Sequence, residues 1–398
     1  MKLFSLHKFP VENKTVLLRV DYNVSLEKNK ILEDYKIKET LPTIKFLLEK
    51  KCKIILLTHL GRPQGKVVEE LRLEPLAKEL KKSLPNTKVH KLNDCLGKTV
   101  QKTIATGKTG EIFLLENLRF YPEEEENDLL FAQSLAQLGE LYINDAFGVS
   151  HRAHASVDAI TKFLPAIAGF LMEKEIFHLS QALVPEEPVV WIMGGAKLDK
   201  VELMQQALRK ADYLLIGGAL AFPFLRAQGI KVGHSKIDAA SITIAQEMLE
   251  TNREKIILPL DFVVCEDFSA RAPTQIVPFN QVAPQQIALD LGPQTIKLFK
   301  QYLRKARTII WNGPLGYFEW AQFANATKEI GRALGNLTAT SIVGGGETVS
   351  AIRKFHLEHN ITHLSTGGGA SLEFLAGKKL PGIVALEENY KKFVRKIE

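Results

Sequence analysis

The feature that most constrains the fold is a regular alternation of short apolar runs with amphipathic, helix-like stretches. Such runs are typical of strands buried on both faces of a parallel sheet, because the connecting helices cover both faces. The pattern occurs in both halves of the chain, so we expect a parallel sheet in each. The predicted strands are 14–20, 53–58, 111–117 and 140–145 in the first half, and 189–193, 212–217, 307–313, 340–346 and 362–369 in the second.

The length of 398 residues favours two domains over one. Near the middle, a helix-like segment precedes a Pro-Glu-Glu-Pro sequence that favours extended chain, as an interdomain connector would. We therefore predict an α/β fold with two doubly wound, Rossmann-like parallel-sheet domains joined by a hinge helix. The predicted parts are an N-terminal domain at 1–170, an interdomain helix and linker at 171–188, a C-terminal domain at 189–378, and a tail at 379–398 that packs back on the N-terminal domain.

Composition and charge exclude several classes of protein. Hydrophobic residues make up 45% of the chain and charged residues 24%, which are globular values and exclude disordered and fibrous proteins. The net charge of +7 is spread along the chain, so we expect no nucleic-acid partner. No apolar run is long enough to span a bilayer, so we expect no membrane partner. Three scattered cysteines, Cys52, Cys95 and Cys265, and the lack of a signal-peptide core predict a cytoplasmic protein.

The residues that follow the first-half strands are polar and basic. Ligands of open parallel sheets bind outside the carboxyl ends of the strands, so these positions carry the candidate chemistry. An arginine fork matches the geometry of phosphate and carboxylate groups. A single arginine is more often a solvated surface residue, but three that converge on one sheet edge favour an anion site. These three are Arg62, Arg119 and Arg152.

The second-half strands end in glycine instead. Glycine lets backbone N–H groups approach a phosphate, and the dipole of the following helix favours an anion. A lone glycine pair is more often a tight turn, but five glycine-rich strand ends in one domain favour a nucleotide site. Lys197 and Lys200 follow the first of them and supply positive charge. The glycines are at 194–195, 217–218, 313, 344–346 and 367–369.

The spacing of the relevant residues excludes several other kinds of site. The Gly-Lys-Thr sequences at 97–99 and 107–109 lack the earlier glycine of a P-loop, and neither triple-glycine run completes the dinucleotide fingerprint. No nucleophile elbow is present, and the two histidine groups lack a carboxylate at metal-binding spacing. The histidines are His151 and His154, and His356, His359 and His363. One half suited to a small acid and the other to a nucleotide is the arrangement of a small-molecule kinase.

Nine motifs along nearly the whole chain, very specific when taken in order, resemble those of the phosphoglycerate kinase family. They are RVDYNV (19–24), LTHLGRP (57–63), LLENLRF (114–120), NDAFGVSHRAHAS (144–156), AGFLMEKE (168–175), GGAK (194–197), WNGPLGYFE (311–319), GGGET (344–348) and STGGGASLEFL (365–375). The resemblance implies a monomeric glycolytic and gluconeogenic enzyme. It would transfer a phosphoryl group between 1,3-bisphosphoglycerate and MgADP, giving 3-phosphoglycerate and MgATP, in line and after hinge closure.

The resemblance also implies a role for each matching residue, with the substrate in the N-terminal domain and the nucleotide in the C-terminal domain. The implied catalytic residues are Lys36, Lys197 and Gly345, and the implied Mg²⁺ ligand is Glu347. The implied substrate-binding residues are Asp21, Tyr22, Asn23, Lys36, His59, Leu60, Gly61, Arg62, Arg119 and Arg152. The implied nucleotide-binding residues are Gly195, Lys197, Lys200, Gly217, Gly292, Asn312, Pro314, Glu319, Gly344, Gly345, Gly346, Glu347 and Thr348.

Four features depart from the family pattern. Lys36 replaces an arginine, Glu347 an aspartate and Ala219 a glycine, and the spacing from Lys197 to Lys200 is one residue shorter. Two alternatives therefore stay open. The chain could be a catalytically weakened relative that acts as a binding protein on the same fold. It could also phosphorylate a different carboxylate, although the residues that would then change match the family.

Overall fold

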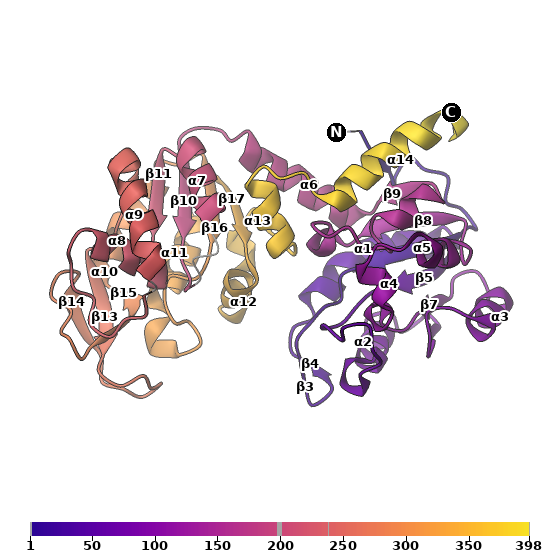
Figure 1. Ribbon diagram of the computed structural model, residues 1–398, viewed down its shortest axis with the longest axis horizontal. Coiled ribbons are helices and arrows are strands. Elements are labelled where there is room, and N and C mark those ends of the chain that lie inside the picture. The colour runs from indigo at the N-terminus through magenta and orange to yellow at the C-terminus, as the bar shows by residue number, and fades with distance from the viewer. Residues whose placement is uncertain (1, 197–200, 238, 398) are drawn as a thin grey trace. The chain divides into compact units, whose positions relative to one another are not determined.

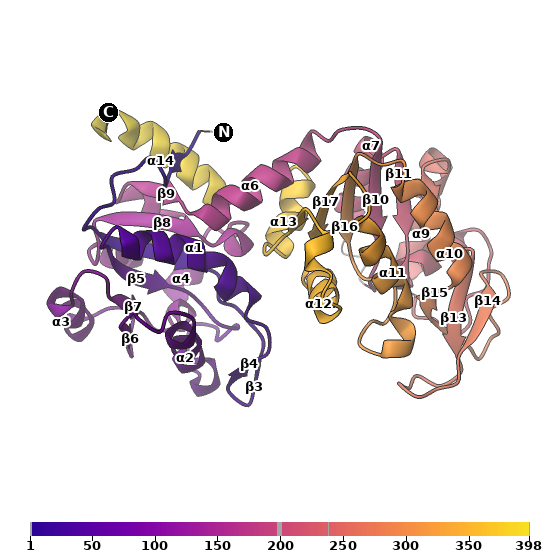
Figure 2. The ribbon, with the colours of Figure 1, turned by 180° about the vertical axis from the view of Figure 1, so that it is seen from behind.

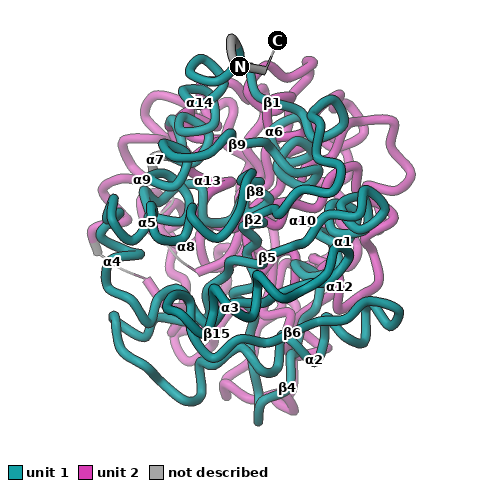
Figure 3. Tube along the Cα trace, turned by 90° about the vertical axis from the view of Figure 1, so that its right-hand side faces the viewer, with its two compact units in different colours: residues 1–177, 379–398 teal, residues 178–378 magenta. Residues whose placement is uncertain are grey.

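The computed structural model describes residues 2–196, 201–237 and 239–397. The chain divides into two compact units, coloured separately in Figure 3. Unit 1 comprises Met1–Phe177 and Lys379–Glu398, and unit 2 comprises His178–Lys378. Each unit is built around a parallel sheet, so the predicted α/β fold with two doubly wound sheets is confirmed. None of the described helices combines the length and the apolar character that a membrane crossing requires.

The seven strands of the unit 1 sheet are all parallel to their neighbours. Their order across the sheet is β1 (Phe4–Ser5), β9 (Ala166–Ala168), β8 (Leu141–Asp145), β2 (Thr15–Val20), β5 (Lys53–Leu57), β7 (Ile112–Leu114) and β6 (Val89–Lys91). The chain leaves β2 on one side and later returns on its other side with β8. This reversal is a topological switch point, where open sheets bind ligands. A separate two-stranded ribbon consists of β3 (Leu26–Glu27) and β4 (Lys30–Ile31).

Helices cover the unit 1 sheet because its strands are apolar on both faces. The helices are α1 (Tyr35–Glu49), α2 (Glu74–Ser83), α3 (Lys98–Thr106), α4 (Pro122–Glu125), α5 (Leu129–Ala136) and α14 (Pro381–Ile397), with α6 (Phe170–Leu183) running from unit 1 into unit 2. Ile44 of α1 and Leu76 of α2 belong to the same buried cluster as Leu18 of β2. Figure 2 shows α1 lying along the sheet. Leu17 and Arg19 alternate with Leu18, so they point to the opposite face, and both are fully buried.

The last helix, α14, packs on unit 1 although unit 2 precedes it in the sequence (Figure 1, yellow). Its buried Asn389 side chain accepts a hydrogen bond from the Ala166 N–H of β9 at 2.8 Å and donates one to the Leu164 carbonyl at 2.8 Å. The Tyr390 ring lies 4.8 Å from the Phe4 ring, measured between centroids. These contacts fix the end of the chain to strands β9 and β1 of the sheet.

Unit 2 contains a six-stranded parallel sheet and a smaller antiparallel sheet. The parallel order is β12 (Ile256–Ile257), β11 (Tyr213–Ile216), β10 (Val189–Met193), β16 (Thr308–Asn312), β17 (Thr340–Gly344) and β18 (His363–Leu364). The antiparallel order is β14 (Gln275–Pro278), β13 (Asp261–Cys265) and β15 (Ile287–Leu291). The helices are α7 (Val201–Lys210), α8 (Ala221–Ala227), α9 (Ala239–Asn252), α10 (Pro293–Leu303), α11 (Asn325–Leu334), α12 (Gly346–Lys354) and α13 (Gly369–Leu375). The switch point of the parallel sheet lies between β10 and β16.

Candidate functional site

At the carboxyl ends of β2 and β5, an acidic and an amide side chain meet a basic side chain from α1. The Asp21 carboxylate accepts hydrogen bonds from Lys36 Nζ at 2.7 Å and from the Asn23 N–H at 3.1 Å. The Asn23 side-chain oxygen accepts one from the Gly61 N–H at 2.9 Å. Burial opposes ionisation of Asp21, but the adjacent Lys36 ammonium, the Asn23 N–H and Arg19 together outweigh it and lower the pKa of that carboxyl. The edge therefore carries a charged carboxylate–ammonium pair that a small polar substrate could bind.

A buried asparagine holds the loop that follows β5. Asn117 accepts a hydrogen bond from the Leu60 N–H at 3.2 Å and donates to the Leu60 carbonyl at 2.8 Å. It also donates to the Leu71 carbonyl at 3.0 Å. Gly61 has a φ of +64°, and a Cβ there would lie 2.7 Å from the Leu71 side chain. The Leu60 side chain is buried, so this loop offers its backbone and the exposed Arg62 side chain to a ligand.

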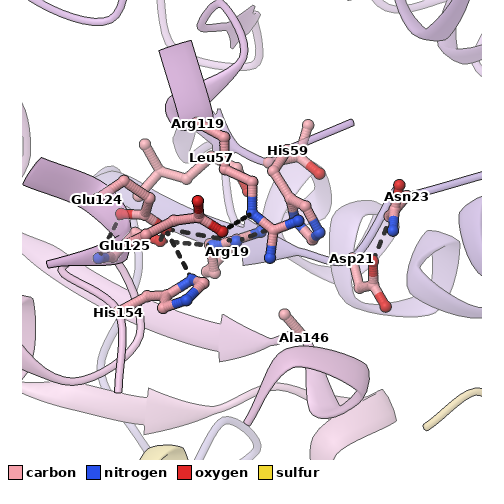
Figure 4. A network of polar contacts seen from close by, with 12 residues as sticks. Arg19, Asp21, Asn23, Leu57, His59, Arg119, Glu124, Glu125, Ala146 and His154 are labelled. Atoms are coloured by element: carbon pink, nitrogen blue, oxygen red, sulfur yellow. Dashed lines mark hydrogen bonds and ion pairs between the residues drawn. The ribbon is translucent and has the colours of Figure 1, made fainter. Parts of the chain in front are cut away.

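The other two predicted arginines lie deeper in unit 1 than Arg62. Arg119, in the short helix η2 (Leu118–Phe120), is 3% exposed and donates from Nη1 to the Gly61 carbonyl at 2.8 Å. Its Nε lies 3.2 Å from a carboxylate oxygen of Glu125. Burial lowers the pKa of Arg119 to about 10, so it remains positively charged at neutral pH. Arg152 is half-buried. Figure 4 shows Arg119 and His59 in one polar cluster with Asp21 and Asn23 beside it.

The Tyr22 side chain points into the core. Its hydroxyl lies 2.7 Å from the Thr40 hydroxyl, and burial raises the pKa of the phenol. The Tyr22 N–H donates to the Thr58 hydroxyl at 3.1 Å. Tyr22 thus supports the end of β2 from inside the unit, and only its backbone could contact a ligand.

In unit 2, the ends of β10 and β16 approach so closely that only glycine fits between them. The Gly194 N–H donates to the Asn312 carbonyl at 2.9 Å, and the Gly195 N–H donates to the Pro314 carbonyl at 2.8 Å. A Cβ on Gly194 would lie 2.2 Å from the Pro314 carbonyl oxygen. A Cβ on Gly313, whose φ is +95°, would lie 2.0 Å from the Gly194 carbonyl oxygen. At the switch point these two strand ends therefore present backbone atoms without side chains.

A pocket opens at this switch point, where open parallel sheets bind their ligands. Four of the predicted nucleotide-binding residues line it: Gly195, Pro314, Glu319 and Glu347. The aromatic walls come from Phe222 of α8, Phe262 of β13 and Tyr317, none of which the strand-end argument identified. Gly218 lines the pocket, whereas the predicted Gly217 lies just before it. Apolar walls with a few carboxylates at the rim suit a flat base attached to a polar sugar and phosphates.

Asp290 of β15 also lines this pocket and was not predicted. Its two oxygens accept hydrogen bonds from the Leu291 N–H at 2.9 Å and the Ala326 N–H at 3.1 Å. Burial raises the pKa of Asp290 to about 7. The carboxyl therefore holds the start of α11 against β15. Nothing in the sequence near Asp290 indicated its contact with Ala326.

The amino-terminal end of α12 lies beside the same switch point. Gly345, with a φ of +90°, precedes the helix, and no side chain caps it with a hydrogen bond. Asn312 donates to the Gly344 carbonyl at 3.0 Å, and the Gly313 N–H donates to the Thr348 hydroxyl at 2.7 Å. N–H groups of an uncapped first turn can bind an anion. The exposed Glu347 carboxylate stands in that turn and reaches the pocket rim.

Two predicted lysines and one predicted glycine are not among the residues placed at the pocket so far. Lys197 and Lys200 lie outside the described residues. Gly292 immediately precedes α10, where its N–H donates to the Asp261 carbonyl at 2.9 Å and a Cβ would lie 2.2 Å from the Asp261 carboxyl carbon. It follows a pocket-lining strand but does not line the pocket.

Comparison with known proteins identifies the family. The sequence model described as "Phosphoglycerate kinase" matches residues 6–378. Phosphoglycerate kinase of Moorella thermoacetica is 49% identical over 98% of this chain and 100% of its own length, and that of Dictyoglomus turgidum is 47% identical over 95% and 96%. The crystal structure of phosphoglycerate kinase from Pyrococcus horikoshii superposes with a TM-score of 0.89 at 34% identity, covering 98% of this chain and 100% of that one. The Coxiella burnetii structure gives 0.85 at 35% identity, covering 97% and 99%. The chain belongs to the phosphoglycerate kinase family.

Proposed function

We propose that this chain catalyses the reversible transfer of a phosphoryl group between 1,3-bisphosphoglycerate and MgADP, giving 3-phosphoglycerate and MgATP in glycolysis and gluconeogenesis. The observation that carries the proposal is that each unit has its own kind of site at its own switch point. Unit 1 presents buried and exposed arginines beside a carboxylate, and unit 2 presents glycine backbone around an apolar pocket. Family membership supports combining these two sites in one reaction.

The unit 1 edge is proposed to bind the glycerate substrate. Arg62, Arg119 and Arg152 supply fixed positive charge for the phosphate that is not transferred, and guanidinium forks suit such oxygens. Asp21 can accept a hydrogen bond from the substrate hydroxyl because Lys36 keeps its carboxyl ionised. The Lys36 side chain is 30% exposed in this arrangement, which leaves its ammonium able to face the reacting carboxyl-phosphate end.

The unit 2 pocket is proposed to bind ADP or ATP. The base would lie between Phe222, Phe262 and Tyr317, and Glu319 would accept hydrogen bonds from the ribose hydroxyls. The phosphates would lie toward the first turn of α12, where N–H groups and the helix dipole favour anions. The remaining implied residues of this half-site, Lys197 and Lys200, would add positive charge to the phosphates.

Mg²⁺ is proposed to arrive with the nucleotide. The described residues contain no cluster of three or more His, Cys, Asp or Glu side chains able to hold a metal ion, but Glu347 offers one exposed carboxylate at the pocket rim. Magnesium commonly binds through one or two carboxylates together with substrate phosphates and several waters. Glu347 therefore fits such a site, and the ion would neutralise negative charge on the phosphates.

The chemistry asks for positioning and charge stabilisation rather than a covalent nucleophile. The substrate carboxylate or the ADP oxygen attacks phosphorus, so no general base has to remove a proton. Lys36, the α12 N–H groups and the lysines that follow Gly195 are the groups proposed to stabilise the transferred phosphoryl charge. We further propose a monomer that works in the cytoplasm, where the buried free thiols of Cys52, Cys95 and Cys265 would stay reduced.

The proposal is tested by a coupled assay of the purified full-length chain with 3-phosphoglycerate and MgATP, followed through ADP formation. Turnover that depends on both substrates is the expected result. Calorimetry on the same protein should show 3-phosphoglycerate and MgADP binding independently. Arg119→Gln should abolish the heat of 3-phosphoglycerate binding and keep the heat of MgADP binding, because Arg119 lies in the unit 1 cluster. Binding of both ligands without turnover would favour a binding protein over a kinase, and turnover with another carboxylate alone would reassign the substrate.

A further inference from the structure

Arg19 is a charged residue buried inside a strand, and every nitrogen of its side chain has a partner. It is 0% exposed and lies on the β2 face opposite the α1–α2 cluster. Its Nε donates to the Ser156 hydroxyl at 2.7 Å, and its Nη1 donates to the Val20 and Leu57 carbonyls. Its Nη2 lies 3.2 Å from Nδ1 of His59, in the loop after β5 (Figure 4).

The Arg19–His59 contact determines which nitrogen of His59 carries a proton. A guanidinium remains protonated in proteins and can only donate hydrogen bonds. His59 Nδ1 must therefore accept, which requires a lone pair there and places the single proton of the neutral ring on Nε2. A second proton on Nδ1 would direct an N–H at the Arg19 N–H and would add charge to a buried site.

The charges around His59 favour the same state. Burial lowers the pKa of His59 well below its usual value, and Arg19 of β2, Arg119 of η2, Lys36 of α1 and His154 lower it further. The opposing charges pair with these basic groups and not with His59: Glu124 lies 3.7 Å from Arg19, Glu125 lies 3.2 Å from Arg119 and Asp21 lies 2.7 Å from Lys36. His59 is 1% exposed, so solvent screens these positive charges only weakly.

A second set of contacts fixes the orientation of Arg19. Glu124 of α4, also 0% exposed, has a carboxylate oxygen 3.7 Å from Arg19 Nη2. The Ser156 hydroxyl, which accepts from Arg19, donates to that same Glu124 oxygen at 2.6 Å, and the Ser156 N–H donates to the other at 2.9 Å. Arg19, Ser156 and Glu124 form a closed, charge-balanced triangle beneath the β5 loop. The guanidinium therefore cannot turn away from His59 without breaking these bonds.

We propose that Arg19 is a positioning residue that fixes His59 as the neutral tautomer with its proton on Nε2. His59 then gives a substrate phosphate a directed hydrogen bond rather than a positive charge, and the arginines supply the charge. This inference rests on the proposed function only for the identity of the ligand. The tautomer itself belongs to the free protein.

The first test reads the tautomer directly in the full-length chain. Long-range proton–nitrogen NMR with ¹⁵N-labelled histidine, assigned with a His59→Gln variant, should show an unprotonated Nδ1 and a protonated Nε2 from pH 6 to pH 8. A protonated Nδ1, or an imidazolium that titrates in this range, would overturn the proposal. Neither result depends on turnover, so this test fails or succeeds separately from the proposed kinase activity.

The second test asks whether Arg19 is the cause. Arg19→Lys keeps a positive charge facing Glu124 but cannot fill all the Arg19 contacts, so His59 should become a mixture of tautomers. If that variant does not fold, Ser156→Ala removes the hydroxyl that aligns Nε and should move the His59 signals in the same direction. Unchanged His59 signals in the folded variant would assign the tautomer to another cause and contradict the proposal.

The third test separates a hydrogen-bond donor from a charge. Gln can present an N–H close to the place of Nε2 without any charge, whereas Leu of similar size cannot. His59→Leu should raise the KM for 3-phosphoglycerate by roughly ten- to a hundredfold, the usual effect of losing a hydrogen bond to a charged group. His59→Gln should recover most of that loss, with the KM for ATP unchanged in both. Equal losses in the two variants would mean that charge, and not the donor, is what His59 supplies.

Discussion

Lys36 Nζ lies 2.7 Å from a carboxylate oxygen of Asp21, and the pair joins α1 to the carboxyl end of β2. The lysine thus has two functions to perform. It keeps Asp21 ionised, and its remaining donors can face a ligand. A family arginine at this position would have a planar fork, whereas an ammonium is a compact charge with rotatable donors.

We predict that Lys36→Ala lowers turnover by roughly tenfold or more, because a charge-assisted hydrogen bond is lost and Asp21 is left without its partner. Lys36→Arg should equal or exceed the natural chain. Lys38→Ala is the matched control, since Lys38 lies on the same helix, is 57% exposed and forms its ion pair with Asp34 at 2.7 Å. Steady-state kinetics of the three variants decide the point. A fully active Lys36→Ala variant would remove Lys36 from the site.

Gly345 and Gly346 offer a second matched pair. A Cβ on Gly345 would lie 2.7 Å from the Asn312 side-chain nitrogen, which is buried and bonded to the Gly344 carbonyl, and the φ of +90° disfavours any side chain. A Cβ on Gly346 would meet nothing within 4 Å. We predict that Gly345→Ala destabilises unit 2 by about 1–3 kcal/mol and that Gly346→Ala is nearly neutral.

Tryptophan fluorescence during urea unfolding measures this difference, because Trp191, Trp311 and Trp320 all lie in unit 2. Gly345→Ala should also weaken MgADP binding, since its strain falls on the first turn of α12. Equal stability of the two variants would show that Asn312 can move aside and that the glycine is not required by packing.

The sequence predicted the sheets well because their strands are continuous apolar runs. All nine predicted strands are present, although β7 (Ile112–Leu114) and β18 (His363–Leu364) are shorter than the predicted runs 111–117 and 362–369. The short strands β1, β6, β9 and β12 contain only two or three residues each and left no periodic signal. The antiparallel sheet was missed because β13 and β15 lie among prolines and polar residues that resemble loops.

Site residues that closely follow a strand in the sequence could be predicted. Residues that belong to a site only through contacts with distant parts of the chain could not. Asp21, His59 and Arg119 follow this rule and meet at one edge of unit 1. Glu124 and Ser156 do not, because each matters only through its contact with Arg19, which is distant in sequence. A charged residue inside an apolar run was nevertheless a usable signal, since a buried arginine needs partners. Aromatic pocket residues such as Phe222 gave no such signal, because apolar side chains suit any core.

Glu347 leads to a prediction about metal dependence. We expect Glu347→Gln to raise the Mg²⁺ concentration needed for half-maximal turnover several-fold, because the amide is a weaker ligand for a hard cation. Glu347→Asp should keep the requirement near that of the natural chain. Glu319→Gln serves as the contrast and should raise the KM for ATP without changing the Mg²⁺ requirement. Calorimetry gives a second reading, in which Glu347→Gln weakens binding of MgADP but leaves binding of metal-free ADP unchanged. Equal weakening of both would contradict a metal contact.

Asp145 lies at the end of β8 and holds the start of α6. One of its oxygens accepts hydrogen bonds from the N–H groups of Leu171 at 2.8 Å and Met172 at 3.2 Å. Burial raises the pKa of this carboxyl from 3.8 to about 7. The Thr43 hydroxyl and the two N–H groups favour the anion and lower the pKa, but burial outweighs them. The folded chain therefore binds this proton more tightly than the unfolded chain does. Its contribution to stability is complete below about pH 4 and is lost as the pH rises to about 7.

We predict that Asp145→Asn removes this loss, because asparagine keeps an oxygen for Leu171 and Met172 and cannot ionise. The stability of the variant relative to the natural chain should increase between pH 5 and pH 7, by at most about 1.4 kcal/mol for each pH unit, and should level off above pH 7. Urea unfolding followed by circular dichroism at pH 5, 6, 7 and 8 measures the difference. A pH-independent difference between Asp145→Asn and the natural chain would mean that Asp145 stays ionised in the folded protein and that its N–H partners outweigh burial.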